Sequence, residues 1–357
     1  LLVGLEIKRE LLVGELSSFR KAALPFIAAC GGMLFPVLVY SFVCAPGTPG
    51  GQGLAIPMAT DIAFSLGVLS LLGKRVPLSL KIFLTAFAVV DDIGGILVIA
   101  VFYSSHVAYG YLLVAILLLI LRYFIGKRTV ANKLFFLVIG VVIWYLFLQS
   151  GIHSTIAGVL LAFVIPAKPQ LRAGRYIERI RRIINTFPVM GENDIVLTNE
   201  QIAQLKRVES ASDRVISPLQ SLEDNLHGVV NYIILPLFAF VNAGVVFSGG
   251  GEVIGEVSIA VALGLLCGKF LGIYFFTWLA VKSKLTPMPQ GMDWKNIAGV
   301  ALLGGIGFTV SLFIANLSFG VTHPVLLNQA KFGVLSGTAL AGILGYIVLY
   351  LVLPKKR

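Results

Sequence analysis

Two short runs of the sequence decide the fold that we expect. Residues 56–65 read Ile56-Pro57-Met58-Ala59-Thr60-Asp61-Ile62-Ala63-Phe64-Ser65, and residues 303–309 read Leu303-Gly304-Gly305-Ile306-Gly307-Phe308-Thr309. Each run lies inside an apolar segment, yet its proline, aspartate or glycines disfavour a continuous helix. Backbone that leaves the helix at membrane depth is tolerated only where a cavity or other protein covers it. We therefore predict broken membrane helices near residues 57–65 and 303–309.

Glycines in a membrane helix also permit close packing between helices, and that is their more frequent role. The similarity of the two runs favours the broken-helix interpretation. Ile62-Ala63-Phe64-Ser65 resembles Ile306-Gly307-Phe308-Thr309, and Gly95-Ile96-Leu97 resembles Gly342-Ile343-Leu344 at nearly the same separation along the chain. An odd number of apolar segments lies between the two units, so they have opposite topology, which is typical of an inverted-repeat secondary transporter.

The composition supports a membrane protein. Of 357 residues, 57% are hydrophobic and only 13% are charged, and the mean hydropathy is +0.93. These values exclude a soluble nucleic-acid binder, a secreted disulfide scaffold and a disordered tail protein, despite a net charge of +11. The three cysteines, Cys30, Cys44 and Cys267, lie singly in or near apolar segments and show no metal-like spacing.

Apolar runs of spanning length divide the chain into one helix fragment and ten spans. The fragment covers Leu1 to about Leu16, and the spans begin near Ala22, Ala55, Pro77, Tyr109, Lys133, Gly151, Gly228, Val257, Ile297 and Leu326. We expect a first membrane part at residues 1–167, a mixed-charge insertion at 168–228 and a second membrane part at 229–357. The fold class is thus an all-α polytopic membrane helix bundle with inverted-topology repeats and two broken, crossing helices.

Lysine and arginine are concentrated in alternate connections, such as Lys74-Arg75, the insertion and the terminal Lys355-Lys356-Arg357. The opposite connections, such as Pro46 to Leu54, carry neither residue. Basic loops remain on the cytoplasmic side of the membrane. We therefore expect the insertion and the C-terminus to be cytoplasmic.

The insertion contains two predicted helices. Arg175 to Ile184 has amphipathic spacing with a basic face, which suits a helix lying on anionic lipid. Thr198 opens a Thr-Asn-Glu-Gln run that is typical of a capping box at a second helix. A solvated linker with two helices and no chemistry is the alternative that we favour.

Three of the 17 acidic residues, Asp61, Asp91 and Asp92, lie deep within predicted spans. An ionised carboxylate at that depth costs about 2.5 to 3.5 kcal/mol, so it needs water, a counter-charge or a bound cation. Lys269 lies centrally in its own span and is the natural counter-charge. A purely structural ion pair is one alternative. One lysine cannot neutralise three carboxylates, however, so we predict a cation or proton site.

Two other classes of function remain open. Lys269 could anchor an organic anion while the aspartates carry protons, because one fold can host different cargoes. Asp61 and Asp91 could instead form an intramembrane aspartyl protease dyad, although Asp92 and Lys269 would perturb it.

Six runs carry a resemblance that covers nearly the whole chain. They are Leu2 to Leu11, Ala59 to Phe64, Ala88 to Asp92, Ser150 to Thr155, Leu235 to Gly244, and Gly305 to Thr309. In their order and spacing the sequence resembles the NhaA-type Na+/H+ antiporters, a family already known for inverted-topology repeats. This resemblance implies a pH-regulated, electrogenic secondary antiporter that exports Na+ or Li+ in exchange for H+, and not an enzyme.

The resemblance also assigns roles to individual residues. Asp91 and Asp92 would form the cation and proton site, supported at the broken helices by Thr60, Asp61, Lys269, Gly305, Gly307 and Thr309. Lys269 would pair with Asp91, and Asp61 would face the N-terminal dipoles of the half-helices. Glu6, Glu10 and His227 match positions associated with the cytoplasmic funnel and pH sensing, but they could equally be ordinary surface residues.

The resemblance implies no cofactor and no nucleic acid, since the transported ions are the substrates. The expected partners are Na+, Li+, H+ and the lipid bilayer, in a bacterial inner membrane. A homodimer is left open, because we expect the chain to lack the family's first helix and the hairpin through which relatives dimerise.

Overall fold

The computed structural model describes residues 1–357 except 103–107, 127–132, 170, 188–195, 197, 247–252, 290, 321 and 355–357; of residues 125–126 and 133–137 it describes only the backbone. The basic run Lys355-Lys356-Arg357, which we expect to be cytoplasmic, lies outside the described residues. The described part contains helices and loops but no strand. The predicted all-α fold class is confirmed.

The α-helices are, in chain order, α1 (Leu2–Leu12), α2 (Phe19–Val43), α3 (Ile62–Ser70), α4 (Leu78–Phe102), α5 (Tyr109–Gly126), α6 (Lys133–Gln149), α7 (Thr155–Val164), α8 (Ala173–Asn185), α9 (Asn199–Val215), α10 (Pro218–Val229), α11 (Leu235–Asn242), α12 (Glu256–Leu263), α13 (Lys269–Lys282), α14 (Trp294–Leu303), α15 (Phe308–Phe319) and α16 (Pro324–Val352). Short 3₁₀ turns lie at Glu15–Ser17, Pro49–Gly53, Ile56–Met58 and Gly73–Arg75. Single π-helical turns, Val230–Ile234 and Gly264–Gly268, join α10 to α11 and α12 to α13.

Each of the ten predicted spans coincides with an apolar helix or helix pair, in the same order along the chain. In the described part, five helical segments are long and apolar enough to cross a membrane. Two further spans are bent pairs, Pro49–Met58 with α3 at 46° and α14 with α15 at 45°. Three shorter apolar helices, α5, α6 and α7, supply the rest. The bends confirm the two predicted broken helices.

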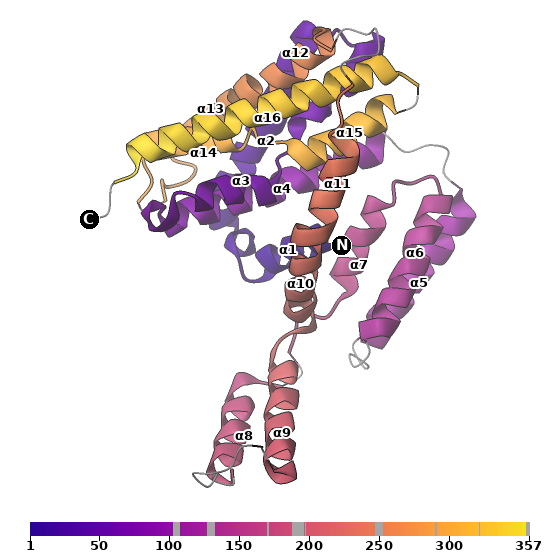
Figure 1. The fold of residues 1–357 in the computed structure, drawn as a ribbon, viewed down its shortest axis with the longest axis vertical. Coiled ribbons are helices and arrows are strands. Elements are labelled where there is room, and N and C mark those ends of the chain that lie inside the picture. The colour runs from indigo at the N-terminus through magenta and orange to yellow at the C-terminus, as the bar shows by residue number, and fades with distance from the viewer. Residues whose placement is uncertain are drawn as a thin grey trace.

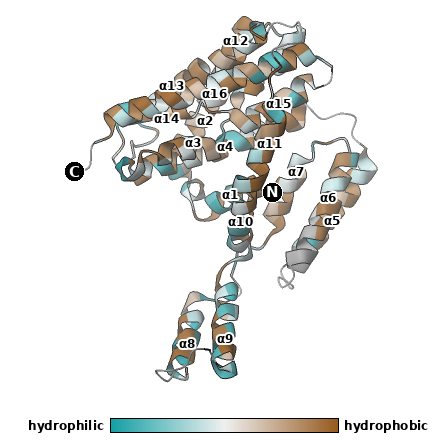
Figure 2. Ribbon diagram, viewed as in Figure 1, coloured by the Kyte–Doolittle hydropathy of each residue, from teal (hydrophilic) through white to brown (hydrophobic). Residues whose placement is uncertain are grey.

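Figure 1 shows how these elements are arranged. Helices α2, α12, α13, α14 and α16 pack together in the upper part of the view, and α5 and α6 lie side by side at its right. The α8–α9 pair extends from the opposite end, below α10. In Figure 2 the apolar residues dominate the bundle, whereas hydrophilic residues are frequent on α8, α9 and α10.

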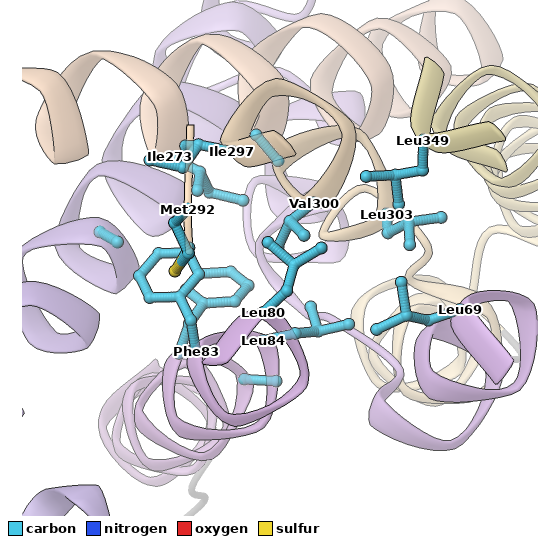
Figure 3. Packing of buried hydrophobic residues seen from close by; sticks show 14 of the residues in the cluster. Leu69, Leu80, Phe83, Leu84, Ile273, Met292, Ile297, Val300, Leu303 and Leu349 are labelled. Carbon is cyan, nitrogen blue, oxygen red and sulfur yellow. The ribbon is translucent and has the colours of Figure 1, made fainter. Parts of the chain in front are cut away.

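The largest buried cluster joins the broken helices to the long spans. Leu69 of α3 and Leu303 of α14 meet Leu80, Phe83 and other residues of α4 in this cluster (Figure 3). Both broken spans are therefore packed against continuous helices, which cover the irregular backbone that membrane depth would otherwise forbid.

Helices α2 and α13 approach closely because glycines face each other. A Cβ atom on Gly272 would overlap the carbonyl oxygen of Gly31, and one on Gly31 would overlap that of Gly272. Small residues at such crossings are typical of membrane helix pairs, where close van der Waals contact stabilises association. This contact holds the helix of Lys269 against the bundle.

The insertion forms a helical hairpin. The capping box predicted at Thr198 is confirmed, because Gln201 N–H donates to Thr198 Oγ1 and Thr198 N–H donates to Gln201 Oε1. The amphipathic helix α8 packs on α9, with Ile183 buried and the Tyr176 hydroxyl 2.8 Å from Ser212 Oγ. The following span begins at Pro218, upstream of the start expected near Gly228.

We predict that Gly272→Val lowers the free energy of unfolding by ~1–3 kcal/mol, because the new side chain forces α2 away from α13. Thermal unfolding of the purified protein in detergent measures the change. Gly67→Ala is the matched control, since no heavy atom lies near the position of its Cβ. Equal loss of stability in both variants would contradict the proposed close contact.

Candidate functional site

The crossing of the two broken helices is centred on Asp61. Its Oδ1 accepts the N–H of Phe64 in the first turn of α3 at 3.2 Å. Its Oδ2 accepts the N–H of Thr309 in the first turn of α15 at 3.1 Å, and also the Thr309 hydroxyl. One buried carboxylate thus meets both helix N-termini, whose dipoles favour a negative charge. Asp61 therefore lies at the N-termini of both half-helices, and its role in the site stays a prediction.

Hydroxyl groups satisfy the carbonyls that the breaks leave free. Thr60 donates to Gly304 O at 2.8 Å and Ser65 donates to Leu303 O at 3.0 Å. In the reverse direction, Ser311 donates to Ile56 O at 2.8 Å. Each half of the crossing therefore completes the hydrogen bonds of the other, as buried backbone requires.

Glycines let these segments approach each other. A Cβ on Gly305 would overlap the carbonyl oxygen of Leu265, and one on Gly307 would overlap the Ser311 hydroxyl. Gly305 and Gly307 therefore support the site by their lack of a side chain. The similar positions Phe64 and Phe308 also pack together, with ring centroids 4.6 Å apart.

Asp91 of α4 and Lys269 of α13 form the expected ion pair. Lys269 Nζ lies 2.6 Å from Asp91 Oδ2, and both side chains are fully buried. The other carboxylate oxygen, Oδ1, has no hydrogen-bond donor among the described residues. Because a buried carboxylate oxygen normally has a partner, this atom is a candidate ligand for a cation or a proton.

A cavity of about 740 Å³ reaches the aspartate pair. Asp91 and Asp92 line it together with Ala59 at the break of the first span, and Trp144 and Thr155 line it from α6 and from α7. Helix α1 also contributes to the wall, and Lys8 holds it to α7 by donating to Phe163 O at 2.7 Å. The cavity is therefore lined by α4 and both broken helices together with α1, α6 and α7.

The predicted pH-sensing residues are only partly brought together. His227 Nε2 lies 3.5 Å from Glu6 Oε1 and 3.8 Å from Glu223 Oε1. Glu10 is not part of this group; it accepts the Glu15 N–H at 3.2 Å and lies 3.7 Å from Arg9. The cluster of Glu6, Glu223 and His227 thus links α1 to α10.

Sequence reasoning did not identify Glu223 and Arg9. Arg9 Nε lies 2.9 Å from Glu223 Oε1, and Glu223 is buried. Glu223 precedes His227 by four residues, which places both on one face of a helix. That spacing was the available signal, but it identifies no partner on α1.

The sequence of this chain is similar to those of known proteins. The family described as "Na+/H+ antiporter 1" matches residues 1–349 of the chain. The chain belongs to this antiporter family. A protein of Bacteroides fragilis named "Na(+)/H(+) antiporter NhaA" is 85% identical over the whole chain, which covers 82% of that relative. Proteins of the same name from Bacteroides thetaiotaomicron and Helicobacter pylori are 81% and 45% identical, with all of this chain covered and 81% and 80% of the relatives.

Membership of the antiporter family decides several broad expectations. The chain is a multi-pass membrane transporter and not an enzyme. Antiporters of this family need no cofactor, because the exchanged ions are themselves the substrates.

We predict that Asp61→Ala destabilises the protein by at least ~2 kcal/mol, because it leaves the N–H groups of Phe64 and Thr309 without an acceptor. Thermal unfolding in detergent tests this. Asp213→Ala, on the exposed surface of α9, is the control. An unchanged unfolding temperature in Asp61→Ala would show that the crossing does not depend on this carboxylate.

Replacement of Lys269 by alanine removes the partner of Asp91 in a buried environment. We expect a loss of ~3–5 kcal/mol and a shifted pH dependence of transport, whereas Lys269→Arg retains more of both properties. Unfolding and transport measured over a pH series test both effects. If alanine and lysine behaved alike, the ion pair would contribute nothing.

Proposed function

We propose that this antiporter exports Na+ or Li+ in exchange for H+, with both ions competing for the carboxylates of Asp91 and Asp92. The observation that carries the proposal is the aspartate pair at the wall of the cavity, next to the broken-helix crossing. One oxygen of Asp91 there has no donor among the residues that the structure describes, and the names of the relatives support the choice of ions.

Competition follows from the chemistry of the carboxylates. When they are ionised, their oxygens replace part of the hydration shell of a small, hard cation. Protonation neutralises the same oxygens, so a bound proton excludes the metal ion and a bound metal ion excludes the proton. Exchange therefore needs no separate coupling device.

Alternating access requires the site to open to one side at a time. Residues of α4 and of the broken helices line the cavity, as do residues of a second group that includes α1, α6 and α7. Relative movement of these two groups would expose the aspartates to either side of a bacterial inner membrane, with the C-terminus on the cytoplasmic side. The crossing moves as one unit, because hydrogen bonds join its halves.

Electrogenic exchange follows if two protons enter for each Na+ that leaves. Each cycle then moves one net charge, which a potential of 100 mV drives with about 2.3 kcal/mol. The inside-negative membrane potential would thus drive Na+ outward.

The other two classes of function are less compatible with the site. An organic anion could bind Lys269 only by breaking its buried pair with Asp91. A protease dyad would require Asp61 to face Asp91 across a water, but the Asp61 oxygens accept hydrogen bonds at the two helix N-termini.

We expect Asp92→Asn to abolish cation-driven proton movement, because an amide neither exchanges a proton nor balances the charge of Na+. Everted vesicles with a trapped pH dye measure the response to NaCl, LiCl and KCl. Asp213→Asn is a control with the same change at an exposed site. Retained Na+-driven alkalinisation in Asp92→Asn would refute this site.

Regulation by pH is assigned to the cluster of Glu6, Glu223 and His227 beside Arg9. Glu6→Gln removes one negative charge, so the remaining groups of the cluster release their protons more easily. We therefore expect the pH profile of transport activity to move to lower pH by ~0.5–1 unit. Glu10→Gln should move it less, because Glu10 does not contact His227. Vesicle assays across a pH series that gave superimposable profiles for Glu6→Gln and the parent would contradict this role.

A further inference from the structure

The α8–α9 hairpin has no part in the proposed exchange, and it carries an unusual distribution of side chains. On α8, Tyr176 and Ile183 face α9. Each residue of a helix is turned about 100° from the one before it. Ile177 and Ile184 therefore project from one side of the hairpin, whereas Arg175 and Arg182, which precede Tyr176 and Ile183, project from the other.

Helix α9 repeats this pattern. Val208 is directed toward α8, because Ala211 is buried and Ser212 meets Tyr176. Ile202, Glu209 and Ile216 follow one another at intervals of seven residues, so they lie on one side of α9. Each comes one residue after a position that is directed toward α8, and Leu205 lies close to them. Arg207 and Arg214 lie one position before it. The two helices are antiparallel. A residue one position after the contact direction on α8 therefore projects from the same side of the hairpin as a residue one position after it on α9.

The hairpin thus has an apolar side and a basic side. The apolar side, which we call the hairpin face, comprises Ile177, Ile184, Ile202, Leu205 and Ile216, with Arg181 and Glu209 among them. Ile177 is 58% exposed, Ile184 65% and Leu205 44%. Exposed apolar side chains gathered on one side of a soluble hairpin indicate a surface that a partner covers.

We propose that the hairpin face binds the same face of a second copy of this chain, so that two hairpins form a four-helix bundle outside the membrane. Figure 1 shows the hairpin extending away from the membrane helices, where a second copy can reach it. Copies inserted in one membrane share an orientation, so their twofold axis is parallel to the membrane normal. Rotation about that axis places α8 of each copy against α9 of the other.

Charge complementarity supports this arrangement. Arg181 lies four residues after Ile177 and three before Ile184, and Glu209 lies four after Leu205. Neither is in an ion pair or hydrogen bond with another described residue. They lie at opposite edges of one hairpin, but the twofold rotation brings each Arg181 beside the Glu209 of the other copy.

The heights of the two residues agree as well. Ser212 lies level with Tyr176 in the hairpin, and Leu171 N–H donates to Arg214 O at 2.9 Å. By this register Arg181 is level with residue 207, two residues from Glu209. That difference is about 3 Å along the axis, which an arginine side chain spans easily.

A membrane surface fits the hairpin face less well. A helix lying on anionic lipid carries its basic residues beside the apolar stripe. Here Arg175, Arg182, Arg207 and Arg214 lie on the opposite side, where they would point away from the lipid. Their mutual repulsion also disfavours pairing of two hairpins through the basic side.

Cross-linking of the full chain tests the arrangement. Cys30, Cys44 and Cys267 are replaced by alanine, and differently tagged copies carrying Arg181→Cys or Glu209→Cys are co-expressed and treated with a short bis-maleimide. We expect a cross-linked dimer that carries both tags. Arg182→Cys with Glu209→Cys is the matched control and should give at least tenfold less product, because Arg182 projects from the basic side.

Charge reversal gives an independent readout. Arg181→Glu or Glu209→Arg alone places like charges together and should reduce co-purification of two tagged copies several-fold. Co-expression of the two single variants should restore it, since every contact again joins opposite charges. Unchanged co-purification in the single variants, or equal cross-linking at 181 and 182, would overturn the proposal.

A lipid-bound face would give a different result. A fluorophore on Ile184→Cys in vesicles of phosphatidylglycerol would then be quenched by brominated acyl chains, and no 181–209 cross-link would form. Together these two outcomes would overturn the proposal in favour of membrane binding. Strong cross-linking without quenching is the expected result.

Discussion

The carboxylate of Asp61 is the point on which the site depends. Two helices that stop inside a membrane leave N–H and carbonyl groups that lipid cannot satisfy. Asp61 accepts hydrogen bonds from N–H groups in the first turns of α3 and α15. The hydroxyls of Thr60, Ser65 and Ser311 donate hydrogen bonds to the carbonyl oxygens left free at the breaks. This exchange of hydrogen bonds permits irregular backbone at membrane depth, and it places that backbone beside Asp91 and Asp92.

In the low dielectric of the membrane interior, the charges of Asp61, Asp91 and Asp92 are compensated in different ways. Asp61 is compensated by helix dipoles and hydrogen bonds, and Asp91 by Lys269. Asp92 faces the cavity, and one Asp91 oxygen has no donor among the described residues. A cation or a proton can supply the missing compensation, which is the physical basis of the competition that we propose.

The membrane bundle and the α8–α9 hairpin follow different rules. Within the bundle, glycines such as Gly31 and Gly272 permit close packing, since burial of apolar surface does not drive helices together in lipid. If the hairpin lies outside the membrane, as we propose, water surrounds it and exposed isoleucines become costly. An apolar face there therefore requires a partner, whereas the same residues facing lipid would not.

Local composition predicted the spans and the candidate ion site, because hydropathy and the cost of a charge in lipid act on each segment separately. The capping box at Thr198 was readable for the same reason, since both partners lie within one turn. The similarity of two distant runs was needed to predict the breaks. Only the tertiary structure brought Glu6 and Arg9 of α1 to His227 and Glu223 of α10, and it left Glu10 without a contact to His227. Such contacts depend on how distant helices are rotated and placed against each other, which no short stretch of sequence encodes.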